Sequence, residues 1–427
     1  MKVNLYFSAL RFRQSISIII ASFRCLLNPS ASRKAFFRTK FELRFKNVFS
    51  LNSAIAMPSN RSSIYAILKA LEIQRDEEVI VTGYTCAAVI EPILSLGAKP
   101  VLVDVNIEDF AINADALESR ISKHTRVIIV QHTYGLPAEI AEIKKIADKW
   151  GIFLIEDCAL ALGSRTDNGF LGGVGDATVW SFELSKTISV GWGGLISVNG
   201  NLGLSEKIKL IRTKAGYHSR KSMSLRLFQG GMSGLFYHHS MPLLLTKYLF
   251  GPFVKLGLFK RSADTKANNL KMPSDQQWNF LLQQFDSLEE ITARSRYIAG
   301  IYDKVLSENN CQPSWSSVST EGTSLIRYPF FVSDRKGFVN HFSKKSIEVG
   351  QWFSSPVSGI SMLENFEYVE GSCPVAEWIC GHVINLPLHS RLDDKTVDVI
   401  AQMLNEYLKS YPEESEWISA KNLRSLY

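Results

Sequence analysis

The most constraining feature of this sequence is an alternation of short apolar runs with segments of helical periodicity between residues 60 and 200. The runs are apolar throughout, and the segments between them repeat apolar residues every three or four positions. Strands of this kind joined by helices form a mainly parallel sheet covered on both faces, so we predict an α/β fold. The expected strands are EEVIVTG (77–83), KPVLVDV (99–105), RVIIVQHT (126–133), IFLIEDC (152–158), ATVWSF (177–182) and GLISV (194–198).

The alternation stops after residue 205, which predicts a change of domain. A long helical pattern follows at 274–307, and the later pattern of one strand (LIRYPFFVSD) and two helices indicates a smaller α+β domain. We therefore expect a basic N-terminal extension, a large domain with a basic apolar insertion, and a C-terminal small domain. The expected ranges are 1–45 for the extension, 46–285 for the large domain, about 217–265 for the insertion, and 286–427 for the small domain.

Charge is distributed unevenly along the 427 residues, whose net charge is +7. Residues 1–41 contain eight Lys or Arg and residues 207–263 contain eleven, without an acidic residue in either segment. The remaining 29 of the 48 basic residues stand against all 41 acidic residues, a net of −12. Because the body of the chain is acidic and no RNA- or DNA-reading motif appears, we expect no nucleic-acid partner.

Both basic segments also contain apolar clusters, SISIIIASF (15–23) and MPLLLTKYLFGPFVKLGLF (241–259). The first is too short to span a bilayer and the second is interrupted by Lys and Pro. Such segments are typical of helices that lie on an anionic membrane surface, and the alternative is packing on the core or on a partner subunit. The six cysteines form no CxxC pair, which is typical of a reducing compartment. We expect a cytoplasmic protein, with peripheral contact with the inner membrane surface as a separate hypothesis.

Four positions carry the chemistry, and each follows a strand or opens a helix. Lys186 stands alone in the turn SFELSKTISVGWGG, Asp157 ends IFLIEDC, Ser181 ends ATVWSF, and SNRSSIY opens a helix with Arg61 and Ser62. Each has an ordinary explanation as a loop lysine, a capping residue or a helix cap. Together they match one ligand. Pyridoxal 5′-phosphate has an aldehyde for a lysine, a pyridine nitrogen for a carboxylate and a phosphate for a helix N-terminus.

With these residues in place, the sequence resembles the DegT/DnrJ/EryC1/StrS family of pyridoxal-phosphate-dependent sugar aminotransferases, on the fold-type I aminotransferase fold. The resemblance begins near residue 55 and excludes the insertion. It rests on these motifs: DEEVIVTGYT, GAKPVLVDV, HTYGLPAEIAEIKKIADKWGIFLIEDCALALGS, GGVGDATVWSFELSKTISVGWGG and CPVAEWICGHVINLPLH.

The resemblance implies a role for each matching residue. Lys186 binds the cofactor's aldehyde, Asp157 pairs with the pyridine nitrogen, and Ser181 with the Arg61–Ser62 turn holds the phosphate. The family is dimeric with shared active sites, and ANNLKM (267–272) occupies the place of a loop that reaches the neighbouring subunit's phosphate. Asn269 is the candidate residue there, with Lys271 beside it.

Several residues depart from the family pattern. Leu160 replaces a Gln that bonds to the cofactor, and Trp192 replaces the Glu of a Gly-Glu-Gly-Gly turn. Cys86 occupies the position that often carries a ring-stacking aromatic residue, which leaves Tyr84 or His132 as substitutes. His132 is equally open to interpretation as a packed core histidine, and Arg61 replaces a small residue.

The implied function is transfer of an amino group from an amino acid, usually glutamate, to a nucleotide-linked keto sugar. Such products enter cell-surface polysaccharides, including lipopolysaccharide. Two alternatives stay open. One is a sugar dehydratase of the same family, in which histidine replaces the lysine, and Lys186 argues against it. The other is a non-catalytic, membrane-associated relative, which Leu160, Cys86 and the basic segments motivate.

Overall fold

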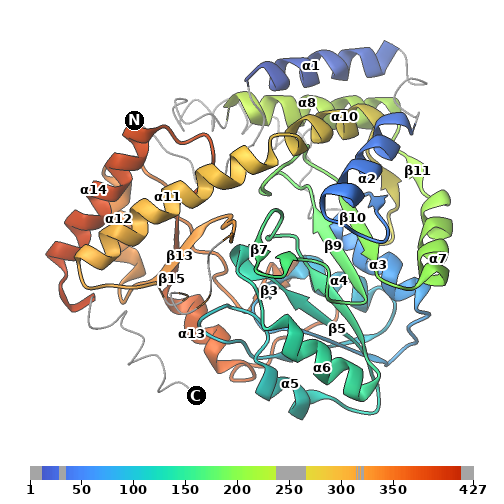
Figure 1. Ribbon diagram of the computed structural model, residues 1–427, viewed down its shortest axis with the longest axis horizontal. Helices are drawn as coiled ribbons and strands as arrows, with labels where there is room; N and C mark the ends of the chain where they lie inside the picture. The colour runs from blue at the N-terminus through green and yellow to red at the C-terminus, as the bar shows by residue number, and fades with distance from the viewer. Residues whose placement is uncertain are drawn as a thin grey trace.

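The computed structural model describes residues 12–27, 35–236, 266–313, 315, 318 and 322–414. Its centre is a seven-stranded sheet with helices on both faces (Figure 1). The sheet has the order β1-β10-β9-β6-β5-β2-β4. The strands are β1 (Ile55–Met57), β2 (Glu78–Thr82), β4 (Lys99–Val103), β5 (Thr125–Gln131), β6 (Phe153–Asp157), β9 (Ala177–Ser181) and β10 (Gly194–Val198).

All six strands expected from the apolar runs are present, and β1 is an addition. Strands β9, β6, β5, β2 and β4 run parallel, whereas β10 is antiparallel to both of its neighbours, β9 and β1. The carboxyl ends of β6 and β9 therefore lie at one edge of the sheet, where ligands bind in open α/β folds.

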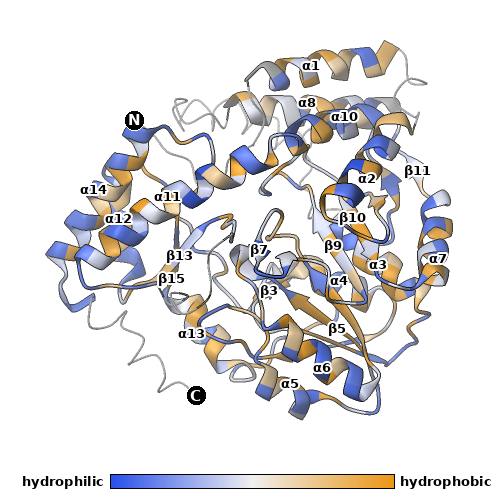
Figure 2. Ribbon diagram, in the orientation of Figure 1, coloured by the Kyte–Doolittle hydropathy of each residue, from blue (hydrophilic) through white to orange (hydrophobic). Residues whose placement is uncertain are grey.

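Both faces of the sheet are buried because successive strand residues point to opposite sides. On β2, Val79 and Val81 belong to the cluster beneath α3 (Asn60–Ala70), α4 (Ala87–Leu94) and α7 (Leu202–Thr213). Ile80 faces the other way, into the cluster formed with α5 (Ala114–Arg120) and α6 (Ile140–Trp150). In Figure 2 strand β5 is mostly orange, whereas β9, which contains Thr, Trp and Ser, is paler.

The smaller C-terminal part packs around the antiparallel pair β13 (Tyr328–Phe331) and β15 (Val383–Leu386). The helix expected at 274–307 is two helices, α10 (Asp275–Phe285) and α11 (Leu288–Glu308), which are separated at Asp286 and Ser287. Helix α11 begins against the large domain at Leu288 and ends in the core of the small one. The other helices there are α12 (Arg335–Ser343), α13 (Pro374–His382) and α14 (Asp394–Ser410).

Short pairings complete the architecture. Strand β14 (Val357–Ser358) pairs in parallel with β3 (Thr85–Cys86) and ties the small domain to the large one. The remaining pairs are β11 (Gly216–Tyr217) with β12 (Lys271–Met272), and β7 (Arg165–Thr166) with β8 (Gly169–Phe170).

Helix α2 (Phe36–Val48) crosses the boundary expected at residue 45 and packs as part of the large domain. Phe41 and Phe45 are fully buried, and the ring of Phe45 lies 5.1 Å from that of Trp180 in β9. Glu42 accepts a hydrogen bond from the backbone of Ala56 at 2.8 Å and pairs with Arg212 of α7. The expected boundary at residue 45 therefore falls inside a helix of the large domain.

Helices α1 (Phe12–Leu27) and α8 (Arg220–Phe236) lie together above the large domain (Figure 1). Helix α8 is the first part of the expected insertion, and the apolar cluster at 241–259 lies outside the described residues. Among the helices that the structure describes, none combines the length and apolar character needed to cross a bilayer.

If α2 belongs to the large domain, removing its central ring should destabilise the whole protein. We expect Phe45→Ala to lower the free energy of unfolding by about 3–5 kcal/mol, because it leaves a cavity beside Trp180. Leu43→Ala, at an exposed position of the same helix, should cost less than about 0.5 kcal/mol. Urea denaturation of both variants makes the comparison, and similar midpoints for the two would contradict the packing described.

Candidate active site

Lys186 lies in the turn between β9 and β10, and helix α10 holds that turn in place. The Lys186 backbone N–H donates to Glu183 O at 3.0 Å. Three residues further, Ser189 exchanges two hydrogen bonds with the buried Gln284 side chain, at 3.0 and 2.8 Å. Gly193 has φ +130°, in the region that favours glycine, and so allows the chain to enter β10. These bonds fix the conformation of the turn that contains Lys186.

The surroundings of Lys186 favour the neutral form of its amine. Desolvation of the ammonium lowers the pKa of Lys186, and the opposing influence of Glu183, Cys86 and Asp157 does not cancel this effect. A lowered pKa increases the fraction of neutral amine, which is the form that attacks a carbonyl carbon. The arrangement is the one expected of a lysine that bonds to an aldehyde.

Asp157 ends β6 and is almost fully buried. Its Oδ1 accepts hydrogen bonds from Asn60 Nδ2 at 3.1 Å and from the Ala159 backbone at 3.0 Å. Burial nevertheless raises the pKa of Asp157, because these bonds and the charge of Lys186 compensate only in part. A buried carboxylate in this state gains from a cation placed against it, such as a protonated ring nitrogen.

The N-terminus of α3 lies beside these residues. Ser59 and Ser62 form a capping box, in which Ser59 Oγ accepts from Ser62 N at 3.1 Å and Ser62 Oγ accepts from Ser59 N at 2.9 Å. Gly194, which pairs with Ser181, brings the start of β10 against this cap. A Cβ at Gly194 would lie 2.5 Å from the Ser59 carbonyl carbon, so only glycine allows the close approach. Ser181 and the α3 N-terminus are thus neighbours.

Arg61 points from this helix start toward the loop before β12. Its Nε lies 3.7 Å from Glu91 Oε2, and Glu91 accepts a hydrogen bond from Ala267 N at 2.9 Å. Asn269 is exposed on the same loop. The predicted phosphate-binding roles of Arg61, Ser62 and Asn269 stay predictions, and the Ser62 hydroxyl is engaged in the helix cap.

Asn60 is a site residue that sequence reasoning missed. The motif SNRSSIY drew attention to the cation and hydroxyls after it, but Asn60 makes the bond to Asp157. Its buried Oδ1 has no hydrogen-bond partner among the described residues. The sequence did place Asn60 at the first position of a predicted helix, and that helix was expected to start near the carboxyl ends of the strands.

Cys86 is influenced by the charged groups of the site, whereas the Tyr84 hydroxyl is engaged in the core between the domains. Lys186, Asp157 and Arg61 all act electrostatically on the Cys86 thiol, and burial raises its pKa. Tyr84 is fully buried in the core between the domains, where its hydroxyl accepts from Phe353 N at 2.6 Å and contacts Tyr134 Oη at 2.7 Å. Tyr84 therefore acts as a core residue, and the expectation that it substitutes as a stacking ring has no support from its contacts.

An aromatic residue of the small domain, Trp352, lies near Lys186. Lys186 Nζ lies 5.7 Å from the centre of the Trp352 ring, and Arg327 Cζ lies 3.8 Å from the same ring. Asn385 Oδ1 fixes Trp352 by accepting its backbone N–H at 3.0 Å. Neither Trp352 nor Arg327 has a local motif, so no sequence signal pointed to them.

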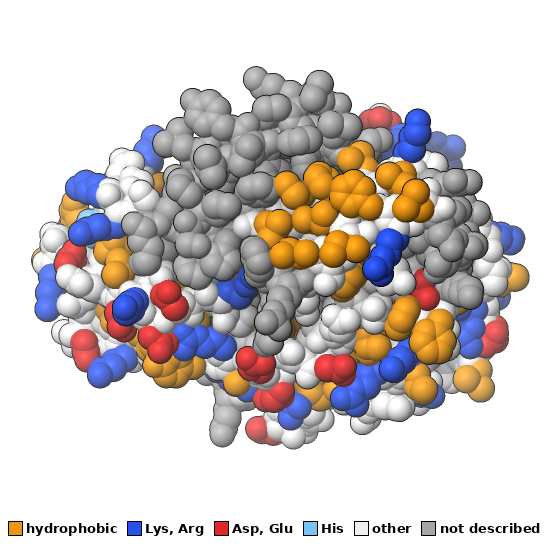
Figure 3. All heavy atoms as spheres, turned by 90° about the horizontal axis from the view of Figure 1, so that it is seen from above, with side chains coloured by type: hydrophobic (Ala, Val, Ile, Leu, Met, Phe, Trp, Pro, Cys, Tyr) orange, Lys and Arg blue, Asp and Glu red, His pale blue; other side chains and the backbone are white. Residues whose placement is uncertain are grey.

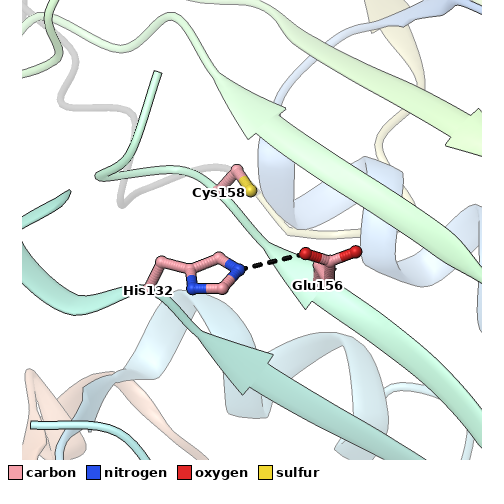
Figure 4. A group of neighbouring side chains, drawn as sticks. All are labelled: His132, Glu156 and Cys158. Atoms are coloured by element: carbon pink, nitrogen blue, oxygen red, sulfur yellow. Dashed lines mark hydrogen bonds and ion pairs between the residues drawn. The ribbon is translucent and has the colours of Figure 1, made fainter. Parts of the chain in front are cut away.

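His132, Glu156 and Cys158 form a buried group that has the composition of a metal site (Figure 4). The His132 ring and the Glu156 carboxylate of this group are already engaged in hydrogen bonds within the protein. Ala138 N donates to His132 Nδ1 at 3.0 Å, so the ring proton lies on Nε2, which donates to Glu156 at 3.1 Å. Glu156 also accepts backbone N–H groups from the turn GGVGD (172–176), including that of Val174 at 2.7 Å.

These bonds decide between the two interpretations of His132. Burial alone would raise the pKa of Glu156, but the hydrogen bonds from His132 and from the backbone of Gly175 and Val174 lower it overall. Glu156 and Asp157 are adjacent on β6 and point to opposite faces of the sheet. His132 is therefore a packed core histidine on the face away from Asp157, and the GGVGD turn contacts Glu156.

The other departures also have definite places. Leu160 is buried and contributes no hydrogen-bonding group. Trp192 is buried beneath Arg226 of α8, whose Cζ lies 4.4 Å from the indole ring. Trp192, at the position where the family pattern has Glu, thus contacts helix α8 of the insertion.

The residues present fit pyridoxal 5′-phosphate. A desolvated lysine, a buried carboxylate with a raised pKa and an Asn60 oxygen without a hydrogen-bond partner among the described residues lie at the carboxyl edge of the sheet. The N-terminus of α3, against which Gly194 packs closely, lies beside them. Fold and site together define a fold-type I, pyridoxal-phosphate-dependent aminotransferase.

The comparisons with known proteins identify the family. The chain belongs to the DegT/DnrJ/EryC1/StrS aminotransferase family, whose model matches residues 30–405. The match includes α2, which we had expected to lie outside the resemblance. GDP-perosamine synthase of Escherichia coli O157:H7 is 26% identical over 390 residues, covering 90% of this chain and 93% of the relative.

Solved structures of the family have the same fold. An aminotransferase of pseudoaminic acid biosynthesis from Helicobacter pylori superposes with a TM-score of 0.73 at 20% identity, covering 96% of this chain and all of the other. A DegT/DnrJ/EryC1/StrS aminotransferase from Brucella abortus gives a TM-score of 0.72 at 19% identity, covering 95% and 99%.

The Glu156 group should behave as structural support and not as a metal site. Glu156→Gln replaces an accepting oxygen with an NH₂ group that faces backbone N–H donors, and we expect it to lower stability by about 2 kcal/mol or more. Glu142→Gln, an exposed carboxylate on α6, is the matched control. Thermal denaturation before and after chelator treatment tests both points. A wild-type protein that melts lower after chelation would refute the structural interpretation.

Proposed function

We propose that this enzyme moves an amino group from an amino acid, glutamate in the first instance, to the keto group of a nucleotide-linked sugar. The observation that carries the proposal is the placement of Lys186, in the turn after β9, and the buried Asp157, at the end of β6, at the carboxyl edge of the sheet beside the start of α3. The product would serve amino-sugar or cell-surface polysaccharide biosynthesis.

Relatives support the substrate class. Besides the perosamine synthase, a transaminase named for dTDP-3-amino-3,4,6-trideoxy-α-D-glucose from Micromonospora megalomicea is 24% identical, covering 86% of this chain and 88% of the relative. Both names refer to amino sugars carried on a nucleotide. We expect the residues that line the site, among them Trp352 and Arg327, to determine which sugar the enzyme accepts.

The residues would divide the work as follows. Pyridoxal 5′-phosphate supplies an aldehyde that takes up the amino group and a ring that delocalises negative charge from the donor's Cα. Asp157 would keep a proton on the ring nitrogen. Lys186 would hold the cofactor at rest and, as a neutral amine, would serve as the base for the donor's Cα proton. Ser181 and the α3 N-terminus would hold the phosphate, and in a homodimer Asn269 of a second subunit would add a further contact with it.

The test of this function is spectroscopic. We expect the purified protein to show a visible cofactor absorbance that L-glutamate bleaches, and borohydride reduction to fix the cofactor's mass on the peptide containing Lys186. Lys186→Ala should lose both signals and all turnover, whereas Lys145→Ala, an exposed lysine on α6, should lose neither. Absorbance that glutamate leaves unchanged would reject glutamate as donor, and no cofactor adduct at all would favour the non-catalytic alternative.

Asn60 should strengthen cofactor binding through Asp157. Asn60→Ala removes a hydrogen bond to a buried carboxylate, which is worth about 1.5–3 kcal/mol, so we expect cofactor affinity to fall by about tenfold or more. Asn60→Asp should lower the cofactor affinity further, because it places a second carboxylate beside Asp157. Titration of the apoprotein with pyridoxal 5′-phosphate measures both. Unchanged affinity in Asn60→Ala would remove this residue from the site.

A further inference from the structure

Helix α1 turns a continuous apolar stripe toward the outside of the molecule. Ile16, Ile20, Phe23 and Leu27 are 40, 46, 57 and 84% exposed. Their spacing of four, three and four residues places them on one side of the helix. Figure 3 shows hydrophobic side chains gathered on the face of the molecule that carries α1 and α8. We call these four residues the α1 outer face.

The opposite side of α1 is buried and mixes polar with apolar residues. It carries Ser15, Ser22, Ile18 and Cys25, which are all buried. A Cβ at Gly231 of α8 would lie 2.6 Å from Ile19 Cγ1 and 2.8 Å from Ser15 O, so the two helices are in close contact. A surface helix in water normally directs its apolar stripe inward and its polar residues outward. In α1 two serines face inward and large apolar residues face outward, which indicates an apolar partner for the outer face.

Charge indicates the nature of that partner. Residues 1–41 and 207–263, which include both helices, contain 8 and 11 basic residues and no acidic residue, although the rest of the chain is net acidic. A second copy of this chain docked symmetrically would place the same basic surface against itself. A bilayer with anionic headgroups offers both an apolar interior boundary and negative charge.

The helix pair is also attached to the part of the chain that carries the lysine. Arg226 of α8 stacks on Trp192, and Trp192 lies in the turn that follows Lys186. Gln277 of α10 donates to Val190 O in the same turn at 3.3 Å. The α1–α8 pair is therefore a fixed platform and not a separate appendage.

We propose that the α1 outer face docks on an anionic lipid surface, with α1 lying in the plane of the interface. The described residues of α1 have one buried side and one exposed apolar side, which suits a helix lying on a bilayer more than one crossing it. Arg24 and Lys221 are exposed on the two helices and provide the contact with the headgroups.

The experiment is flotation of the full-length protein with vesicles of phosphatidylcholine alone and of an equimolar mixture with phosphatidylglycerol, at low and high salt. We expect binding only to the anionic vesicles and weaker binding at high salt. Ile20→Asp with Phe23→Asp should reduce the bound fraction about tenfold or more, and Arg24→Glu with Lys221→Glu should do the same.

The control is Leu202→Asp with Leu210→Asp, which adds the same charges at exposed apolar positions of α7 and should leave flotation unchanged. Light scattering of each variant reports its oligomeric state. Equal flotation of wild type and Ile20→Asp/Phe23→Asp, or no flotation of wild type, would overturn the proposal. Loss of a dimer in that variant would overturn it in favour of a subunit interface. Flotation needs no turnover, so its outcome is independent of the proposed reaction.

Discussion

A carboxylate buried at the end of a parallel strand is the constraint on which the rest of this site depends. Burying an unpaired charge costs more than one or two hydrogen bonds return, and Asp157 retains a raised pKa despite its bonds to Asn60 and Ala159. The unfavourable burial of Asp157 occurs at the position where the cationic ring nitrogen of a cofactor would bind. The same burial that destabilises the free carboxylate therefore strengthens its interaction with a bound cofactor, because charges interact more strongly away from water.

Lys186 is the complement of Asp157. Both groups are desolvated, and their pKa values shift in opposite directions, toward the neutral amine and the neutral acid. Each shift follows from the position that the sheet and its turns impose. Gln284 and Gly193 define the turn that carries Lys186, and β6 carries Asp157. Reactivity at this site is thus a property of where the backbone places two ordinary side chains.

The sequence could predict the parts of this arrangement that depend on local pattern. Apolar runs specified six strands, and chain order placed Asp157 and Ser181 at one sheet edge, because parallel strands end together. It could not predict Trp352 and Arg327, which reach Lys186 from the small domain through contacts distant in sequence. Nor could it predict that Tyr84 belongs to the core between the domains, since a strand-end tyrosine has the same local pattern in either role. Helix α2 was misplaced for a related reason: its basic composition suggested an extension, whereas its packing depends on the buried Phe41 and Phe45 and on the ion pair of Glu42 with Arg212.

The two neighbouring acids of β6 show how one strand supports both stability and chemistry. Glu156 faces away from the site, and its bonds from His132 and three backbone N–H groups favour the charged form. Asp157 faces the site with too few donors to do the same. His132 links the two sides, because its backbone N–H donates to Asp157 O at 3.1 Å while its ring bonds to Glu156. A fully satisfied network on one face thereby fixes the strand end, so that the under-satisfied carboxylate on the other face can be held in position for a ligand.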